Sequence, residues 1–226
     1  MATFRLLFCA ALIGGLAAGL AASLVQAGKV WPLIAAAEVL EAAAPGHTHG
    51  HAAHEPVWSP DGPLRLALTV LFNIVAGVGF GLLLNALTRF ETMRSGRVFA
   101  ARDGALWGAA GFVAFSLAPA FGLPPELPGM ASGGLLERQL WWIATACATA
   151  VAIALLVFAP ARWRIAGIAL IVLPHLFGPP HGDDHGSVPG EMAAAFVAAS
   201  LGASAVFWVV LGWTSGWVQQ RLARTR

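Results

Sequence analysis

Residues 66–87 read LALTVLFNIVAGVGFGLLLNAL. No charged residue interrupts the chain between Arg65 and Arg89. A helix needs about 20 predominantly apolar residues to cross the hydrocarbon core of a bilayer. This stretch is long enough and apolar enough, so it predicts a membrane-spanning helix.

The whole chain has the same character. Hydrophobic residues make up 58% of its 226 residues, charged residues make up 11%, and the mean hydropathy is +0.74. Soluble domains carry about a quarter charged residues, so this chain lacks the polar surface that would keep it in water. The net charge of +2 is too small to favour a nucleic-acid partner. We therefore predict an all-α integral membrane protein, with residues 1–226 forming a single membrane domain in contact with lipid.

Five more stretches meet the same criterion, although the fifth span along the chain is the shortest. We expect a bundle of about six transmembrane helices, with spans near 4–27, 64–88, 104–121, 139–159, 162–178 and 191–218. After the first span comes VWPLIAAAEVLEAA, residues 30–43. This segment favours a short amphipathic helix that lies outside the first span.

The first span begins like a secretory signal peptide, with Arg5 before an apolar run. The apolar region of a signal peptide is normally about 7–15 residues long, and this run is longer. Small residues recur in it at every fourth position: Ala11, Gly15, Gly19 and Ser23. The last span has a similar series: Ser200, Ser204, Gly212 and Gly216. Such series are typical of helices packed closely against a neighbour, so we expect the first helix to be retained.

Basic residues orient the spans, because Lys and Arg favour cytoplasmic loops. With the N-terminus inside, ten basic residues fall on the inner side: Arg5, Arg89, Arg94, Arg97, Arg102, Arg162, Arg164, Arg221, Arg224 and Arg226. Three fall on the outer side: Lys29, Arg65 and Arg138. This bias predicts that both termini are cytoplasmic and that the histidine-rich loop at 44–63 is outside.

That loop contains HTHGHAAHE at 47–55. Neutral imidazole is the commonest metal ligand in proteins. His47, His49 and His51 alternate with small residues, and an extended chain places alternate side chains on one face. Together with His54, they are predicted to capture a metal ion outside the membrane. A solvated linker without such a role is the alternative.

A second polar segment, HGDDHG at 181–186, falls on the same predicted side. His181 and His185 are one helical turn apart, and Asp183 and Asp184 between them offer oxygen ligands. An ordinary Gly-Asp turn is the competing interpretation. His175, near the outer end of the fifth span, is either a further ligand or a core histidine bonded to a carbonyl group.

Ligand chemistry alone does not select the metal, because imidazole suits several divalent ions and affinity rises toward copper at any such site. Sequence patterns for a phosphate-binding loop (GxxxxGKS/T), a zinc protease (HExxH) and covalent haem attachment (CxxCH) are all missing. We therefore expect no enzyme activity and no tightly bound cofactor. Polar residues within spans usually face a bundle interior or a pathway, and Asn73 and Glu191 are candidates for either.

Several sequence motifs together resemble those of one known family. They are LPPELPGM at 123–130 followed by ERQLWW at 137–142, FNIVAGVGFGLLL at 72–84, PHLFGPPH at 174–181, and WPLIAAAEVLE ahead of the histidine-rich loop. In these motifs the chain resembles, over nearly its whole length, the CbtA family of predicted cobalt transporter subunits. The resemblance implies cobalt uptake linked to vitamin B12 supply. It also implies a small partner, CbtB, with a single span and its own histidine motif. The positions it carries over are Glu38, Glu126, His175 and His181.

We therefore expect a permease subunit in the bacterial inner membrane that takes up a divalent transition metal, cobalt first, with nickel and zinc as alternatives. The outer histidines would capture the ion, and His175, His181 and Glu126 would pass it to a path between helices. Further pathway candidates are Glu38, Asn73 and Glu191. The rival hypothesis is a membrane-anchored metal buffer or sensor that moves nothing across. Either protein is compatible with oligomerisation.

Overall fold

The computed structural model describes residues 2–43, 62–96, 99–130, 132–180, 182 and 188–224. Within these ranges all regular structure is helical and no strand occurs. In chain order the elements are α1 (Ala2–Lys29), α2 (Trp31–Ala43), α3 (Pro63–Ser95), α4 (Ala101–Phe112), the π-helical turn η1 (Val113–Leu117), α5 (Ala118–Ala120), α6 (Leu135–Phe158), the 3₁₀ turn η2 (Ala161–Trp163), α7 (Arg164–Phe177) and α8 (Gly190–Arg224). The predicted all-α class is confirmed, and α2 is the expected short helix after the first span.

Four of the described helices are long and apolar enough to cross a membrane, namely α1, α3, α6 and α8. The predicted span at 104–121 corresponds to α4 and α5, which are joined directly by the π turn η1. The predicted span at 162–178 contains α7, whose 14 residues extend only about 21 Å at 1.5 Å per residue. A hydrocarbon core is about 30 Å thick, so the predicted count of six spans is not exact.

The ends of α3 and α7 follow from single residues. Pro63 occupies the first turn of α3, where its missing N–H costs nothing. Gly96 then ends α3 in the left-handed region at φ 67°, and its N–H donates to the Thr92 carbonyl at 3.0 Å. Gly178, at φ 76°, ends α7 within one residue of the end of its predicted span. The helix is shorter than that span because the 3₁₀ turn η2 precedes it.

Helices α1, α3, α4 and α8 form a closely packed group, which we call the glycine-packed group. Gly15 of α1 abuts Val78 of α3, and a Cβ added at Gly19 would lie 2.7 Å from the Ile74 Cα. Gly104 of α4 abuts Gly212 of α8 in the same way. Small residues let helix backbones approach this closely in membranes. The packing role predicted for the small-residue series of the first and last spans is confirmed.

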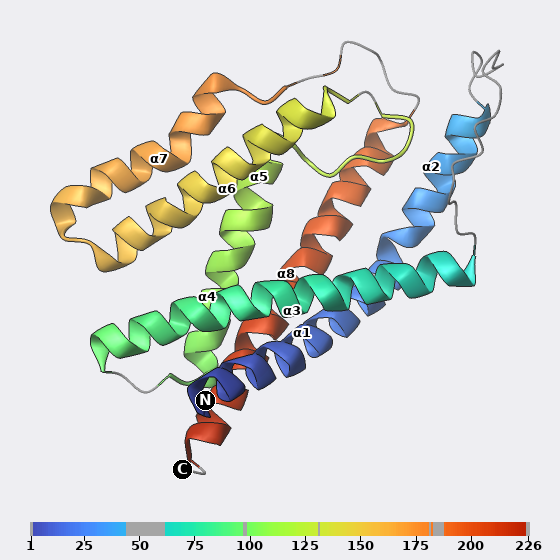
Figure 1. The fold of residues 1–226 in the computed structure, drawn as a ribbon. Helices are drawn as coiled ribbons and strands as arrows, with labels where there is room; N and C mark the ends of the chain where they lie inside the picture. Colours follow the sequence, from blue (N-terminus) through green and yellow to red (C-terminus); the bar gives the residue numbers. More distant parts are fainter. Residues whose placement is uncertain are drawn as a thin grey trace.

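Figure 1 shows the first turn of α1 and the last turns of α8 at the same end of the molecule. We call this the arginine end, because Arg94, in the last turn of α3, and Arg102, at the start of α4, also lie there. The opposite end, where α1 finishes and α3 begins, is the histidine end, since the histidine-rich part of the sequence joins α2 to α3. The alternation of helix directions agrees with the predicted placement of both termini on one side.

The π turn η1 lies between α4 and α5, and the three elements follow one another without a break. Each backbone hydrogen bond of a π turn spans one residue more than in an α-helix. Here the N–H of Ala118 donates to the carbonyl of Val113. Pro119 follows directly, and in a regular α-helix its ring would collide with the carbonyl of Phe115. The wider turn accommodates that ring. Turns of this kind inside α-helices are frequent at functional sites.

Helices α6 and α7 form a hairpin that leans away from the glycine-packed group (Figure 1). Within the hairpin, Gly167 of α7 lies against Ala152 and Leu156 of α6. The hairpin contacts the rest of the described chain mainly through η1 and α5. Toward the arginine end, Phe158 of α6 also stacks on Trp107 of α4 and lies 5.3 Å from the Arg94 guanidinium of α3.

Candidate functional site

A polar cavity lies toward the histidine end, among α1, α3, η1, α6 and α8. Its volume is about 220 Å³, and its polar lining residues are Gln26, Asn73, Ser116, Ser200 and Ser204. An adjoining cavity of about 330 Å³ shares the three serines and reaches Leu123 and Pro125. We call the two cavities together the polar vestibule. None of the described residues that line it is charged.

Asn73 closes one wall of the vestibule by bridging α3 to α1. Its Nδ2 donates to the Gln26 Oε1 at 2.7 Å and to the Ser23 Oγ at 2.9 Å. The Ser23 hydroxyl in turn donates to the Gly19 carbonyl at 2.7 Å. Gly19 lets α3 come close enough for this network, because a side chain there would meet Ile74. The pathway candidate Asn73 is thus held by hydrogen bonds and contributes to a cavity wall.

Two serines form the opposite wall. The hydroxyls of Ser116, in the π turn, and Ser204, in α8, lie 2.8 Å apart and share a hydrogen bond. The π turn places Ser116 and its neighbour Phe115 toward the same cavity. The vestibule therefore presents hydroxyl and amide oxygens, which are neutral ligands for a hydrated cation.

Three aromatic side chains close the vestibule toward the arginine end: Phe80 of α3, Phe115 of η1 and Trp208 of α8. We call them the aromatic partition. The ring centroids of Phe80 and Trp208 lie 4.9 Å apart, those of Phe80 and Phe115 5.3 Å, and those of Phe115 and Trp208 5.5 Å. Aromatic pairs prefer such separations, so the three rings form one continuous contact.

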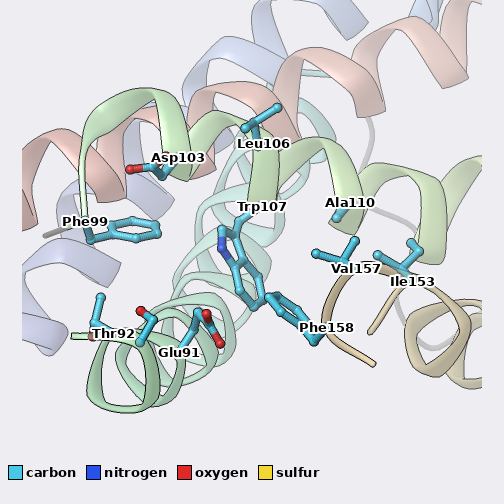
Figure 2. Close-up of a pocket in the computed structure, with 11 residues that line it drawn as sticks. Glu91, Thr92, Phe99, Asp103, Leu106, Trp107, Ala110, Ile153, Val157 and Phe158 are labelled. Carbon is cyan, nitrogen blue, oxygen red and sulfur yellow. The ribbon is translucent and has the colours of Figure 1, made fainter. Parts of the chain in front are cut away.

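On the other side of the partition lies an apolar groove of about 630 Å³ between α3, α4 and α6. It joins a cavity of about 450 Å³ at the arginine end, and the two have five lining residues in common: Glu91, Trp107, Ala110, Ile153 and Phe158. Figure 2 shows the Trp107 indole reaching from α4 toward Glu91 of α3 and Phe158 of α6. We call the two spaces together the arginine-end groove.

Two carboxylates line the arginine-end part of this groove. Glu91 pairs with Arg94, with the Nε and Oε2 atoms 3.1 Å apart, and the Arg94 guanidinium lies 5.3 Å from the centre of the Phe158 ring. Asp103 accepts the backbone N–H of Ala100 at 3.0 Å and so caps the start of α4. The groove therefore changes from apolar at the partition to charged at its mouth, where the two carboxylates and the Arg94 guanidinium lie.

A buried polar layer holds α1, α3 and α8 together near the arginine end. Asn85 and Thr88 are completely buried, and the Gln219 Nε2 donates to the Asn85 Oδ1 at 2.7 Å. Asn85 also donates to the Leu7 carbonyl at 3.4 Å. These residues line none of the cavities described above, so their role is to join helices.

The pathway candidate His175 sits between helices, with both ring nitrogens facing backbone carbonyls. Its Nδ1 lies 3.0 Å from the Ile171 oxygen and its Nε2 lies 3.1 Å from the Ala118 oxygen. Trp141 meets the imidazole edge to face, with centroids 5.6 Å apart, and donates its indole N–H to the Pro174 carbonyl. Coordination of a metal by His175 would require it to release one of the two carbonyls.

Glu126, in the LPPELPGM segment, is held by two partners. Its Oε2 lies 2.5 Å from the Arg138 Nη2 and accepts the Ser132 hydroxyl at 2.7 Å. Gly182, the residue after His181, packs against Ser132, because a Cβ added there would lie 2.8 Å from the Ser132 oxygen. The two sequence segments that contain Glu126 and His181 therefore approach one another at the histidine end.

Glu38 and Glu191 lie at the surface of the same end. Glu38 of α2 pairs with Arg65 of α3, with Oε1 and Nη2 2.6 Å apart. The hydrogen bond from Arg65 lowers the pKa of the Glu38 carboxyl below its ordinary value, against the opposing effect of partial burial. Glu191 is exposed in the first turn of α8. Neither residue lines the vestibule.

The remaining predicted ligands lie outside the described residues. They are His47, His49, His51, His54, His181, Asp183, Asp184 and His185. Among the residues that the structure does describe, no group of three or more His, Cys, Asp or Glu side chains could hold a metal ion. The predicted capture site therefore stays a prediction.

Sequence reasoning did not identify the aromatic partition or the vestibule residue Gln26. Phe80, Phe115 and Trp208 come from three distant segments, and nothing in the local pattern of any one distinguishes it from a lipid-facing aromatic residue. The Phe-Ser-Leu-Ala-Pro order at 115–119 offered one signal, because proline within a helical pattern often marks an interruption.

Comparison with known proteins gives one match. The model of the family described as "Probable cobalt transporter subunit (CbtA)" matches residues 4–220. No curated protein and no solved structure matches the chain.

Proposed function

We propose that this chain, a member of the CbtA family of probable cobalt transporter subunits, is a cobalt importer. It would carry Co²⁺ inward across the inner membrane of a bacterium. The observation that carries this proposal is the family match over residues 4–220. A subunit acts with a partner, and we take that partner to be the single-span, histidine-containing CbtB protein. Nickel and zinc are the competing cargoes.

The first step is capture of the ion by the histidines of segments 47–54 and 181–185. The charge pattern of the loops predicts that both segments are outside, and the packing of Gly182 on Ser132 supports a second segment close to Glu126. Imidazole must be neutral to bind a metal, so capture weakens as the external pH falls below the histidine pKa of about 6.5. The histidine-rich loop then raises the local ion concentration at the mouth of the vestibule.

The second step is passage through the polar vestibule. The hydroxyl and amide oxygens of Asn73, Ser116 and Ser204 suit the water shell of a divalent cation. They carry no charge, so they hold the ion weakly enough to release it. Conduction requires sites that favour binding without trapping the ion, and these oxygens meet both conditions.

Uptake needs no nucleotide, because the membrane potential supplies the energy. A divalent cation that enters an inside-negative compartment gains roughly 4.6 kcal/mol per 100 mV, twice the value for a single charge. That free energy corresponds to an accumulation on the order of a thousandfold. The missing phosphate-binding loop is therefore compatible with transport.

The proposal is tested by Co²⁺ accumulation in cells that make the full chain, with and without the partner, compared with cells that carry an empty vector. We expect accumulation only when the chain is present, and its loss when the membrane potential is collapsed. Binding of Co²⁺ by the purified chain without any accumulation in cells would instead support the membrane-anchored buffer or sensor.

A second comparison separates capture from passage. Replacing His47, His49, His51 and His54 together by Ala should reduce uptake at low Co²⁺ and leave the rate at saturating Co²⁺ unchanged. His181→Ala, and less strongly His175→Ala, should reduce the saturating rate, because these residues adjoin ordered proline-containing backbone. If only the four-histidine variant loses transport at saturation, the histidine-rich loop is part of the path and the assignment of His175 and His181 is wrong.

A further inference from the structure

The same three side chains line two different cavities. Phe80, Phe115 and Trp208 belong both to the polar vestibule and to the apolar part of the arginine-end groove. No other described residue lines both spaces. The aromatic partition is therefore the layer of protein that separates a cavity near one membrane surface from a groove that leads to the other.

The backbone around the partition is built to hold these rings. Gly111 of α4 leaves room for the Trp208 indole, because a Cβ there would collide with the six-membered part of the ring. The indole is 4% exposed. Phe115 is presented by the π turn, one residue before the serine that binds Ser204. Each ring thus comes from a different helix, so a relative movement of those helices would separate them.

The surroundings of the partition differ on its two sides. Serine and amide oxygens face the vestibule, whereas Leu84, Ala114 and Ala154 accompany the rings on the groove side. A constriction lined by apolar groups blocks ions because water does not fill it, and such constrictions act as gates in channels. An ion in the vestibule therefore keeps its oxygen ligands only as far as the rings.

From this arrangement we infer that the aromatic partition is the gate of the transport path, closed in this conformation, with the arginine-end groove as the route of release. The ion leaves through the carboxylate-lined mouth at Glu91 and Asp103. The inference rests on the proposed transport function for its cargo, but the sidedness of the two cavities can be measured without any cobalt.

The experiment uses the full chain in sealed membrane vesicles of known orientation. Its free cysteines, Cys9 and Cys147, are first replaced by Ala. Single reporters are then added as Ser200→Cys in the vestibule and Ala110→Cys in the arginine-end groove. A water-soluble, membrane-impermeant thiol reagent should label Ser200→Cys from the histidine end only and Ala110→Cys from the arginine end only.

Opening the partition should abolish this sidedness. Adding Phe115→Ala, or Phe80→Ala, should let the reagent reach Ser200→Cys from the arginine end at a rate close to that from the histidine end. Phe72→Ala is the matched control, because Phe72 lies on the same helix as Phe80 but is 70% exposed on the outer face of α3. It should leave the labelling one-sided.

Transport provides the second measurement, and it separates the two claims. In the same vesicles, the Phe115→Ala and Phe80→Ala variants should pass Co²⁺ several times faster than the parent protein and should also admit Mg²⁺. The gate is overturned if both variants keep the one-sided labelling of the parent. It is also overturned if the Ser200→Cys reporter in the parent reacts from neither end or from both ends. If the variants abolish the one-sided labelling but the chain moves no cobalt, the partition still separates the two cavities. The proposed transport function is then wrong.

Discussion

The glycine-packed group and the α6–α7 hairpin are both helical, yet they are held together differently. In the group, backbones touch at Gly15, Gly104 and their partners over most of the helix length. The hairpin contacts the rest of the described chain through side chains: His175 reaches a backbone carbonyl of α5, and Phe158 stacks on Trp107 of α4. Close backbone packing resists sliding more than such side-chain contacts do. We therefore expect the group to be fixed and the hairpin to be the more mobile part around the vestibule.

The largest effect should come from breaking the group itself. Gly77→Leu puts a side chain where even a Cβ would lie 2.5 Å from the Gly15 carbonyl oxygen. We expect a loss of about 3 kcal/mol or more of stability, because overpacking forces helices apart. Gly79→Leu, two residues along the same helix and with no neighbour within 4 Å, is the control. Thermal unfolding of the solubilised protein measures both, and equal midpoints would refute the close packing.

A smaller effect is expected in the buried polar layer of the group. Gln219→Leu removes the 2.7 Å bond to Asn85 and should cost about 1–2 kcal/mol, because it leaves a buried amide without its partner. Replacing both residues by Leu should recover most of the loss, since no unpaired group remains. Unfolding midpoints of the two single variants and the double variant give the coupling. A double variant as unstable as the sum of the singles would contradict the pairing.

The hairpin should respond locally rather than globally. Trp141→Phe removes the indole donor to the Pro174 carbonyl, at a cost of about 1 kcal/mol. Hydrogen exchange should speed up in α6 and α7 while α1, α3 and α8 keep their protection. Trp163→Phe, in the exposed turn η2, is the control and should change neither region. Faster exchange spread across α1 and α8 would show that hairpin and group are one rigid unit.

The smallest effect belongs to the exposed pair that joins α2 to the start of α3. Because Arg65 lowers the pKa of Glu38, the pair contributes stability above the ordinary carboxyl pKa of 4.5 and loses it as the pH falls below that value. An exposed pair is worth well under about 1 kcal/mol. Hydrogen exchange in α2 should therefore rise slightly on acidification, and Glu38→Gln should remove this pH dependence. An unchanged pH response in that variant would assign the effect to other groups.

The sequence predicted those helices that can be recognised from a single segment, by the length of an apolar run or by the spacing of small residues. The apolar run at 66–87 and the series Ala11, Gly15, Gly19 and Ser23 correspond to α3 and to the face of α1 packed on it. The spans at 104–121 and 162–178 were less well predicted. In both, a local change of backbone interrupts the predicted span: the π turn before Pro119, and the 3₁₀ turn that precedes α7.

The candidate site was only partly accessible to such reasoning. Asn73 stood out because an amide in a membrane span needs a partner, and its bonds to Ser23 and Gln26 supply one. The aromatic partition had no comparable signal. Its three rings meet only because Gly108 and Gly111 let α8 approach α4, which is a fact of three-dimensional packing. Histidine spacing identified candidate ligands at 47–54 and 181–185, and these stay predictions.

The π turn at 113–117 also bears on how this chain tolerates changes of length. A π turn contains one residue more than an α turn, so deleting a single residue there would leave a regular helix with intact backbone bonds. The segment beyond the deletion would keep nearly the same orientation, because the π turn accommodates its extra residue within one turn. Within the turn itself there would be one side chain fewer, so Phe115 and Ser116 could no longer both face Trp208 and Ser204. A relative that lacks the extra residue should therefore align with a one-residue gap at this point, and its cavity walls should come from different side chains.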